Sequence, residues 1–441
     1  MSGLRRRAVK ATQRAMLFDL WQKTLKHSGE TTALRHAATG SATSFAQLQN
    51  LLDEQALLRR GSLHVATVQD GVEAFVIQTL RAWRDGAVLC PVERDAPVIV
   101  NADSLPTEIC HLKITSGSTG EPRMVMLRGA QLAADAENIR ITMKLDATCP
   151  NAAVISAAHS YGFSNLILPL LLHGHPLIIA ADALPSSLRQ VLALGERVSL
   201  PAVPAMWRAW WQAGLLKDAP VALAISAGAP LPLELERAVF ESCGLKIHNF
   251  LGSSECGGIA YDSSDAPREE ASFAGNAMSG VTLATNEKDC LVVCSASVAE
   301  GYWPRDAATL DNGRFVTSDL AELRGTFVFL RGRMSDSINL AGRKLNPADV
   351  ECALLACRGV RHCVVFGVPS ADAVRCEEAV ACVSASDETL TTDALQRWLG
   401  GRLPAWQVPR RFWLCQDLMP TIRGKTPRGE WRARYLKMQD A

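Results

Sequence analysis

The sequence predicts an α/β protein with a large N-terminal domain of layered, mostly parallel sheets and helices, a β-rich subdomain, and a small α+β C-terminal domain. Strand-like and helical runs alternate through the first half, which favours a parallel sheet. From about Asp289 the runs become short and β-rich, and after Arg333 a new set of strands and helices begins. Since 441 residues exceed the usual size of one hydrophobic core, we expect two domains, 1–333 and 334–441.

The individual elements follow from periodicity and turn residues. Apolar residues at helical spacing predict a helix over Gly71–Trp83, and Ala87–Cys90 is a short strand closed by Pro91. Strand and helix segments then alternate through 153–156, 165–172, 176–180, 204–215 and 221–226, and the β-rich part contains 290–294, 313–316 and 327–330. In the last domain we expect a helix from Pro347 to Ala356, strands over 362–368 and 379–383, and a helix over 392–399.

Composition narrows the function classes. The 46 basic and 45 acidic residues nearly cancel, so no nucleic-acid partner is indicated. The 13 cysteines form no Cys-x-x-Cys pair, which favours reduced, buried thiols over a zinc site. No signal peptide follows Arg5, Arg6 and Arg7, and the apolar stretch Leu166–Ala181 is too short for a membrane span and is expected to be buried, so we expect a cytoplasmic protein.

A loop of hydroxyls and glycines is the sharpest chemical signal. Thr115-Ser116-Gly117-Ser118-Thr119-Gly120-Glu121-Pro122-Arg123 follows the strand-like run His111–Ile114. Glycines bring backbone N–H groups close to a ligand and hydroxyls add donors, so such a loop can cradle a polyphosphate. Taken alone, the same composition is typical of a plain turn, and no Gly-Lys-[Ser/Thr] closes it as in a Walker A loop.

Four further segments carry charged groups that would suit a nucleotide. A carboxylate in Asn249–Glu255 could hold Mg²⁺ together with a phosphate, and the acid of Thr317–Asp319 could bind a ribose. Gly332–Lys344 lies where the two domains join, and Gly424-Lys425 lies near the C-terminus. Each segment alone is as well explained by an exposed loop or linker.

Taken in this order, the five segments resemble the adenylate-forming superfamily of acyl- and aryl-CoA ligases, luciferases and peptide synthetase adenylation domains, with the acyl-CoA synthetases nearest. Supporting segments are His159–Gly162, Ser226–Leu231, Gly275–Ala277 with Gly280, and Gly301–Trp303. The resemblance spans roughly Thr43 to Arg428, which is nearly the whole chain.

The resemblance implies a site. The implied nucleotide-binding residues are Thr115, Ser116, Gly117, Ser118, Thr119, Gly120 and Arg123 for the phosphates, Gly228, Ala229, Pro230, Asn249, Phe250 and Leu251 for adenine, and Asp319 for ribose. The implied catalytic residues are Ser254 at the α-phosphate, Glu255 as Mg²⁺ ligand, His159 between acid pocket and thiol tunnel, Arg333 at the ribose or phosphate, and Lys425 between the substrate carboxylate and the α-phosphate. Lys344 and Gly342 would face the thiol.

The implied reaction joins ATP and a carboxylic acid into an acyl-adenylate and then passes the acyl group to a thiol. In this family the small domain is mobile and rotates between the two steps, here about Ser335 with Asp336 beside it. Met124, Leu251, Ser335 and Asn339 depart from the usual residues, and 420–425 is one residue shorter than the common form. None of these changes removes Glu255, Asp319, Arg333 or Lys425, so we expect an active enzyme.

The sequence is consistent with more than one thiol acceptor and with more than one class of carboxylic acid. Coenzyme A is the expected acceptor, and the phosphopantetheine arm of an acyl or peptidyl carrier protein is the alternative; a non-catalytic nucleotide-binding protein of the same fold is the second alternative. Fatty and aryl acids are equally consistent with the sequence, whereas no charged residue awaits an amino group. We expect Cys256-Gly257-Gly258 and the His159 segment to line the acid pocket, with the glycines leaving room for a chain or ring.

Overall fold

The computed structural model describes residues 16–93, 105–116, 122–304, 309–370, 377–385, 390–419 and 426–439. The chain divides into two compact units. The first holds the residues up to 284 together with 292–317 and 323–328, and the second holds 285–291, 318–322 and the residues from 329 onward. Within the described residues, no helix combines the length and the apolar character that crossing a membrane requires.

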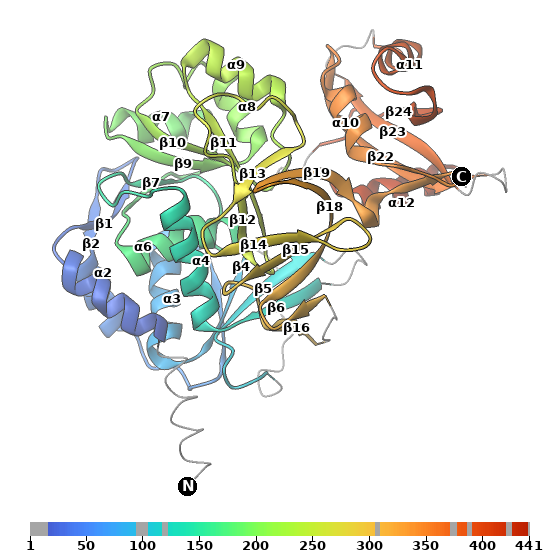
Figure 1. Ribbon diagram of the computed structural model, residues 1–441. Helices are drawn as coiled ribbons and strands as arrows, with labels where there is room; N and C mark the ends of the chain where they lie inside the picture. The colour runs from blue at the N-terminus through green and yellow to red at the C-terminus, as the bar shows by residue number, and fades with distance from the viewer. Residues whose placement is uncertain are drawn as a thin grey trace. The chain divides into compact units, whose positions relative to one another are not determined.

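The first unit is built around a largely parallel sheet, as the sequence predicts (Figure 1). Six strands run parallel in the order β1 (Thr32–His36), β8 (Leu177–Ile179), β7 (Asn151–Ala153), β9 (Val198–Ala202), β10 (Val221–Ser226) and β11 (Ile247–Ser253). Antiparallel strands flank them: β2 (Ala42–Ser44) on β1, and β12 (Gly257–Tyr261) and β13 (Phe273–Ala277) beyond β11.

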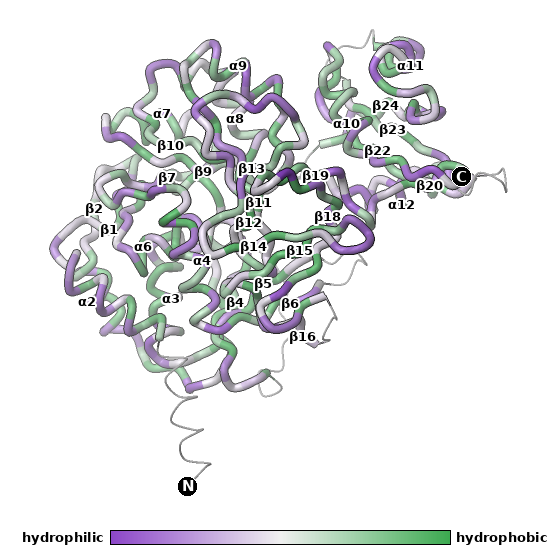
Figure 2. The backbone as a smooth tube through the Cα atoms, viewed as in Figure 1, coloured by the Kyte–Doolittle hydropathy of each residue, from purple (hydrophilic) through white to green (hydrophobic). Residues whose placement is uncertain are grey.

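A second sheet of the same unit has the order β16-β6-β5-β4-β3. Its strands are β3 (Leu63–Thr67), β4 (Val88–Val92), β5 (His111–Ser116), β6 (Pro122–Leu127) and β16 (Gly301–Trp303). The strands β3, β4 and β5 are parallel, and β5, β6 and β16 are antiparallel. Every residue of β4 is buried, and its mostly apolar residues give the tube its hydrophobic colour there (Figure 2).

Helices connect parallel strands of the same sheet, because a parallel pair needs a crossover. They are α3 (Val72–Asp85), α5 (Ser160–Gly162), the π-helical η2 (Phe163–Ile167), α6 (Leu168–His173), α7 (Pro185–Ala193), α8 (Pro204–Gln212) and α9 (Leu233–Cys243). Two further helices, α2 (Phe45–Asp53) and α4 (Gly129–Thr142), lead from one sheet to the other. The helix α3 ends at Gly86, whose φ of 65° suits a residue without a Cβ. The apolar stretch Leu166–Ala181 forms buried helix and strand, as predicted.

The predicted β-rich segment contains β14 (Val281–Thr285), β15 (Cys290–Ser295), β17 (Leu310–Asp311), β18 (Arg314–Arg324) and β19 (Phe327–Arg333). Every cysteine among the described residues is free, and most of them are buried. Cys294 and Cys352 are exposed, so the prediction of buried thiols holds for most of the described cysteines but not for all.

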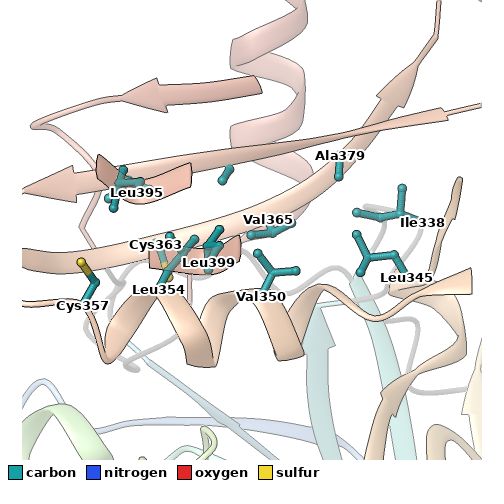
Figure 3. Close-up of a cluster of buried hydrophobic side chains, with 12 residues drawn as sticks. Ile338, Leu345, Val350, Leu354, Cys357, Cys363, Val365, Ala379, Leu395 and Leu399 are labelled. Carbon is teal, nitrogen blue, oxygen red and sulfur yellow. The ribbon is translucent and has the colours of Figure 1, made fainter. Parts of the chain in front are cut away.

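The second unit contains an α+β core. Its elements from 334 onward are η3 (Met334–Asp336), β20 (Ile338–Leu340), β21 (Arg343–Leu345), α10 (Pro347–Leu355), β22 (Val360–Pro369), β23 (Glu377–Ala385), α11 (Thr392–Gly400), η4 (Ala405–Gln407), β24 (Arg411–Leu414) and α12 (Arg428–Gln439). Val365 of β22 packs with Val350 of α10 and Leu399 of α11 (Figure 3). Its neighbour Phe366 packs with Tyr435 of α12, because successive side chains of a strand point to opposite faces.

Candidate active site

The predicted phosphate loop and the predicted catalytic lysine fall largely outside the described residues. Gly117, Ser118, Thr119 and Gly120 are not described, and neither is Lys425. The two ends of the loop are described, because Ser116 closes β5 and Pro122 opens β6 in an antiparallel pair. The Thr115 hydroxyl donates to the carbonyl oxygen of Arg123 at 3.2 Å, which holds the two strands together beside the loop.

Two of the predicted segments lie against each other. The hydroxyl oxygens of Ser160 and Ser254 are 2.8 Å apart, which joins the start of α5 to the turn after β11. His159 caps α5, where its Nδ1 accepts from the backbone N–H of Tyr161 at 3.4 Å. Tyr161 is partly buried, its hydroxyl donates to the carbonyl oxygen of Ile225 at 3.4 Å, and removal of the ring from water raises its pKa well above the ordinary value. The segment that begins with His159 and the turn that carries Ser254 therefore lie against each other.

Glu255 is held by an aromatic hydroxyl from β16. The hydroxyl of Tyr302 donates to Glu255 Oε1 at 3.0 Å, and the backbone N–H of Glu255 donates to Ser253 Oγ at 3.2 Å. Burial, and then the Glu255 charge, raise the pKa of Tyr302, so the phenol stays protonated and acts as a donor. The Arg123 guanidinium lies 5.9 Å from the centre of the Tyr302 ring. The sequence indicated Tyr302 only as part of a matching segment and gave it no role.

A metal at this place would depend on one protein carboxylate. Among the residues that the structure describes, no group of three or more histidine, cysteine, aspartate or glutamate side chains could hold a metal ion. Mg²⁺ commonly takes one or two carboxylates and completes its shell with substrate phosphates and water. A single carboxylate fixed by Tyr302 fits that kind of site, and Glu255 remains the candidate ligand.

The segments predicted for adenine follow β10 and lie in β11. Gly228 has a φ of 84°, a left-handed conformation that favours glycine. The side-chain nitrogen of Asn249 donates to the carbonyl oxygen of Ala274 at 3.3 Å. Phe250 alternates with Asn249 and Leu251 along the strand, and its ring lies 6.0 Å from that of Tyr161. The side chains of Asn249 and Phe250 therefore point to opposite faces of β11, a division that the sequence segment alone does not reveal.

A cluster of four buried charges lies behind these segments and was not predicted. Lys246 pairs with Glu236 and, at 2.6 Å, with Asp262. Arg268 Nε lies 2.7 Å from Glu236 Oε2, and another nitrogen of Arg268 donates to the carbonyl oxygen of Leu231 at 2.6 Å. We call Glu236, Lys246, Asp262 and Arg268 the adenine-side cluster. No local pattern signals it, because its members are spread over α9, the residue before β11 and the loop after β12.

The space beside the two predicted glycines is filled by other side chains. A Cβ at position 257 would overlap the carboxylate of Asp135, and a Cβ at position 258 would lie 2.5 Å from the sulfur of Met278. Glycine is favoured at 257, where φ is 69° and the carboxylate of Asp135 leaves no room for a Cβ, whereas at 258 the flexible Met278 side chain would have to move. Asp135 lies on α4, is 2% exposed, and was not singled out in the sequence.

In the second unit, two predicted residues form an ion pair. Arg333 Nε lies 2.7 Å from Asp319 Oδ1, so a predicted ribose-binding carboxylate and a predicted phosphate-binding cation are brought together. Lys344 is exposed on β21, opposite Asn339 of β20. At the predicted pivot, Ser335 Oγ donates to Asp336 Oδ1 at 3.1 Å.

The C-terminal helix is attached next to this pivot. Arg428, the first residue of α12, pairs with Asp336 and, at 2.7 Å, with Glu351, and its Nε donates to the carbonyl oxygen of Val365 at 2.6 Å. Burial raises the pKa of Glu351, and the Arg428 charge opposes that rise. The start of α12 is thereby fixed to α10, β22 and the pivot segment.

Two protein families and several known proteins match this chain. The AMP-binding enzyme family matches residues 21–303, and the family of the AMP-binding enzyme C-terminal domain matches residues 349–425. Feruloyl-CoA synthase of Amycolatopsis sp is 30% identical over 353 residues, covering 74% of this chain and 70% of that protein. The 4-hydroxybenzoate–CoA/benzoate–CoA ligase of Rhodopseudomonas palustris is 26% identical over 360 residues, covering 76% and 66%.

Solved structures show the same fold. ATP-bound MatB from Rhodopseudomonas palustris has a TM-score of 0.81 at 19% identity, covering 95% of this chain and 99% of that one. The o-succinylbenzoate CoA synthetase (MenE) from Bacillus subtilis, in complex with its acyl-adenylate intermediate, has a TM-score of 0.82 at 18% identity, covering 94% and 97%.

Proposed function

Because the chain belongs to the AMP-binding enzyme family and is an AMP-forming acid–CoA ligase, we propose that it activates a fatty or aryl acid with ATP and Mg²⁺ and transfers the acyl group to coenzyme A. The observation that carries the proposal is the contact between the His159 segment and the Ser254-Glu255 turn, with the Glu255 carboxylate oriented by Tyr302. The relatives named above are CoA ligases of aryl acids, and others are named as ligases of long-chain fatty acids.

In the first step, a carboxylate oxygen of the acid attacks the α-phosphorus of ATP, the bond to the bridging oxygen breaks, and pyrophosphate leaves. Both reactants are anions, so their approach needs fixed positive charge. We assign this role to Lys425 and Arg123, with hydrogen-bond donors from Ser116 to Gly120. Mg²⁺ held at Glu255 would supply further charge neutralisation on the phosphates.

In the second step, the thiol of coenzyme A attacks the acyl carbon, and AMP leaves as the carbon–oxygen bond to its phosphate breaks. We propose that residues 334–441 move as a domain between the two steps, with Ser335 as the pivot and Lys344 facing the thiol. The alternative acceptor is a carrier-protein phosphopantetheine arm, which presents the same thiol chemistry.

The test is pyrophosphate release from ATP and Mg²⁺ with a panel of aryl, fatty and amino acids, followed by thioester detection with coenzyme A and with a phosphopantetheinylated carrier protein. Lys425→Ala should lower release by roughly a hundredfold or more, because one of the charges that offset the meeting anions is gone. Lys437→Ala, at an exposed lysine of α12, is the matched control and should retain the wild-type rate.

Dependence on one acid class would name the substrate, and thioester formation with only one of the two thiols would name the acceptor. A folded protein that binds ATP but releases no pyrophosphate with any acid would contradict the proposal and favour a non-catalytic nucleotide-binding protein.

A further inference from the structure

The turn that carries Glu255 is held from behind by a buried carboxylate. Asp135 Oδ1 accepts from the backbone N–H of Gly258 at 2.9 Å, and Asp135 Oδ2 accepts from the hydroxyl of Ser164 at 2.6 Å. Ser164 follows the His159 segment, and Gly258 follows Glu255, so Asp135 joins the same two segments that Ser160 and Ser254 join. Both donors are neutral, so neither bond places a positive charge against the Asp135 carboxylate.

A buried lysine points to the same place from the second sheet. Lys113 of β5 is opposite Val125 of β6, and Val125 is opposite Tyr302 of β16. Side chains of directly opposite residues in antiparallel strands lie on one face, so Lys113 and Tyr302 share a face of the sheet. The Tyr302 hydroxyl reaches Glu255 from this face, and Lys113 is only 4% exposed there.

The electrostatic surroundings of Lys113 agree with this placement. Burial lowers its pKa, and the group that most favours its charged form is Asp135, with Cys256 and Glu255 next. A buried charge is costly unless an opposite charge lies near it, which explains why Lys113 and Asp135 occur together. The ammonium group is thus subject to the fields of two carboxylates, Asp135 and Glu255.

We propose that the buried pair Lys113 and Asp135 sets how strongly Glu255 binds Mg²⁺, with Lys113 weakening the binding and Asp135 offsetting Lys113. The inference rests on the proposed function, because Glu255 is the candidate metal ligand of that reaction. Lys113 and Asp135 are positioning residues in this account, since they act on the metal through the electric field at Glu255 and not by contact with substrate.

The two single substitutions have opposite expected effects. Lys113→Met removes a cation that repels Mg²⁺, so the Mg²⁺ concentration needed for half-maximal ATP binding should fall by roughly threefold to tenfold. Asp135→Asn keeps the shape and one of the two acceptor oxygens but removes the charge that balances Lys113, so the same concentration should rise by roughly threefold to tenfold. The double variant should return near the wild-type value.

The experiment is calorimetric titration of the protein with ATP, without any acid, over a series of Mg²⁺ concentrations. Thermal unfolding of each variant is recorded first to show that it folds. If Lys113→Met does not fold, the inference is tested with Asp135→Asn or with the double variant. In a Glu255→Gln background the Lys113→Met shift should shrink, because the carboxylate on which the cation acts is gone.

Shifts of the two single variants in the same direction, or unchanged Mg²⁺ dependence in folded variants, would overturn the inference while wild-type acid activation still supports the proposed function. Wild-type protein that binds ATP equally well with and without Mg²⁺ would also overturn the inference, whereas the proposed function is overturned only if no acid gives pyrophosphate release.

Discussion

The first unit contains two groups of buried charges that are paired in different ways. In the adenine-side cluster, Lys246 and Arg268 each contact the carboxylate of Glu236 directly, and Lys246 also contacts Asp262. Beside Glu255, by contrast, Asp135 is bound by a serine hydroxyl and a backbone N–H, and Lys113 is a neighbouring charge.

The two kinds of pairing differ in what they affect: the first stabilises the fold, and the second also sets the electric field at Glu255 in our proposal. Opposite charges in direct contact cancel at a distance, so the adenine-side cluster fixes α9, β11 and the loop after β12 without a strong field elsewhere. Asp135 is bonded to neutral donors, and in our proposal its charge and that of Lys113 act on Glu255. Substitutions in the first group should change stability alone, and substitutions in the second should also change the metal dependence.

The largest expected effect is that of Glu236→Ala. It leaves Arg268 and Lys246 buried with one carboxylate, Asp262, between them, and breaking a buried pair in this way costs about 3–5 kcal/mol. Urea unfolding measures the loss, and the Mg²⁺ dependence of ATP binding should stay unchanged in the folded fraction. Glu137→Ala is the control, because its pair with Arg140 is at the surface and is worth below about 1 kcal/mol. Equal losses in the two variants would contradict the role of burial.

The second largest expected effect is a loss of stability at low pH, which we attribute to the buried His175. Burial lowers the pKa of His175 to about 4, so the folded protein keeps it neutral while the unfolded chain takes up a proton near 6.5. The stability that His175 contributes is present above pH 6.5 and is lost as the pH falls from 6.5 towards 4, by up to about 3 kcal/mol.

Urea unfolding at several pH values between 7 and 4 measures this slope. His175→Phe should flatten it, since phenylalanine takes up no proton in either state. The remaining slope should come from groups such as His111 and His173, whose pKa values burial also lowers. An unchanged slope in His175→Phe would assign the pH dependence to other groups.

A smaller effect is expected for Ser164→Ala, which removes one donor to Asp135. A hydrogen bond to a buried carboxylate contributes about 1.5–3 kcal/mol to stability. The Asp135 charge then acts more fully on Lys113, so the Mg²⁺ requirement should fall by roughly twofold. Ser187→Ala, which loses a hydrogen bond to Asp182 at the start of α7, is the matched control: its stability should fall without a change in Mg²⁺ requirement. A wild-type Mg²⁺ requirement in both serine variants would contradict the proposed action of Asp135 on Lys113.

The smallest effect on stability, about 1 kcal/mol, is expected for Tyr302→Phe. The substitution removes the hydroxyl that orients the Glu255 carboxylate, so the rate of pyrophosphate release should fall by several-fold although the fold is intact. Tyr435→Phe, which removes a hydroxyl bonded to Gln439 in α12, serves as control and should leave the rate unchanged. A wild-type rate in Tyr302→Phe would show that Glu255 needs no orienting donor.

Local periodicity predicted much of the fold. The strand over 221–226 has the bounds of β10, and the helix from Pro347 and the strands over 362–368 and 379–383 appear as α10, β22 and β23. These elements follow from the spacing of apolar residues and from turn residues, which are properties of neighbouring positions. The order of the strands in the sheets depends on contacts between distant segments and was not predicted.

The segments of the candidate site were identified in the sequence through their resemblance to a family, since each alone is as well explained by a loop. The ion pair of Asp319 with Arg333 joins two predicted residues, and the bond between Ser160 and Ser254 joins two predicted segments. Lys113 and Asp135 were missed, because a lysine in a strand and an aspartate in a helix are usually surface residues. Only the packing of α4 behind β12 shows that Asp135 fills the space beside Gly257.

The competition of Gly257 and Asp135 for one volume has a consequence for engineering. Any larger residue at 257 collides with the Asp135 carboxylate and needs a backbone φ of 69°, which residues with a Cβ rarely adopt. Making room for a larger side chain there requires a smaller residue in place of Asp135 on α4, and Lys113 then needs a new counter-charge. Position 257 can therefore be redesigned only by changing helix, strand and charge together.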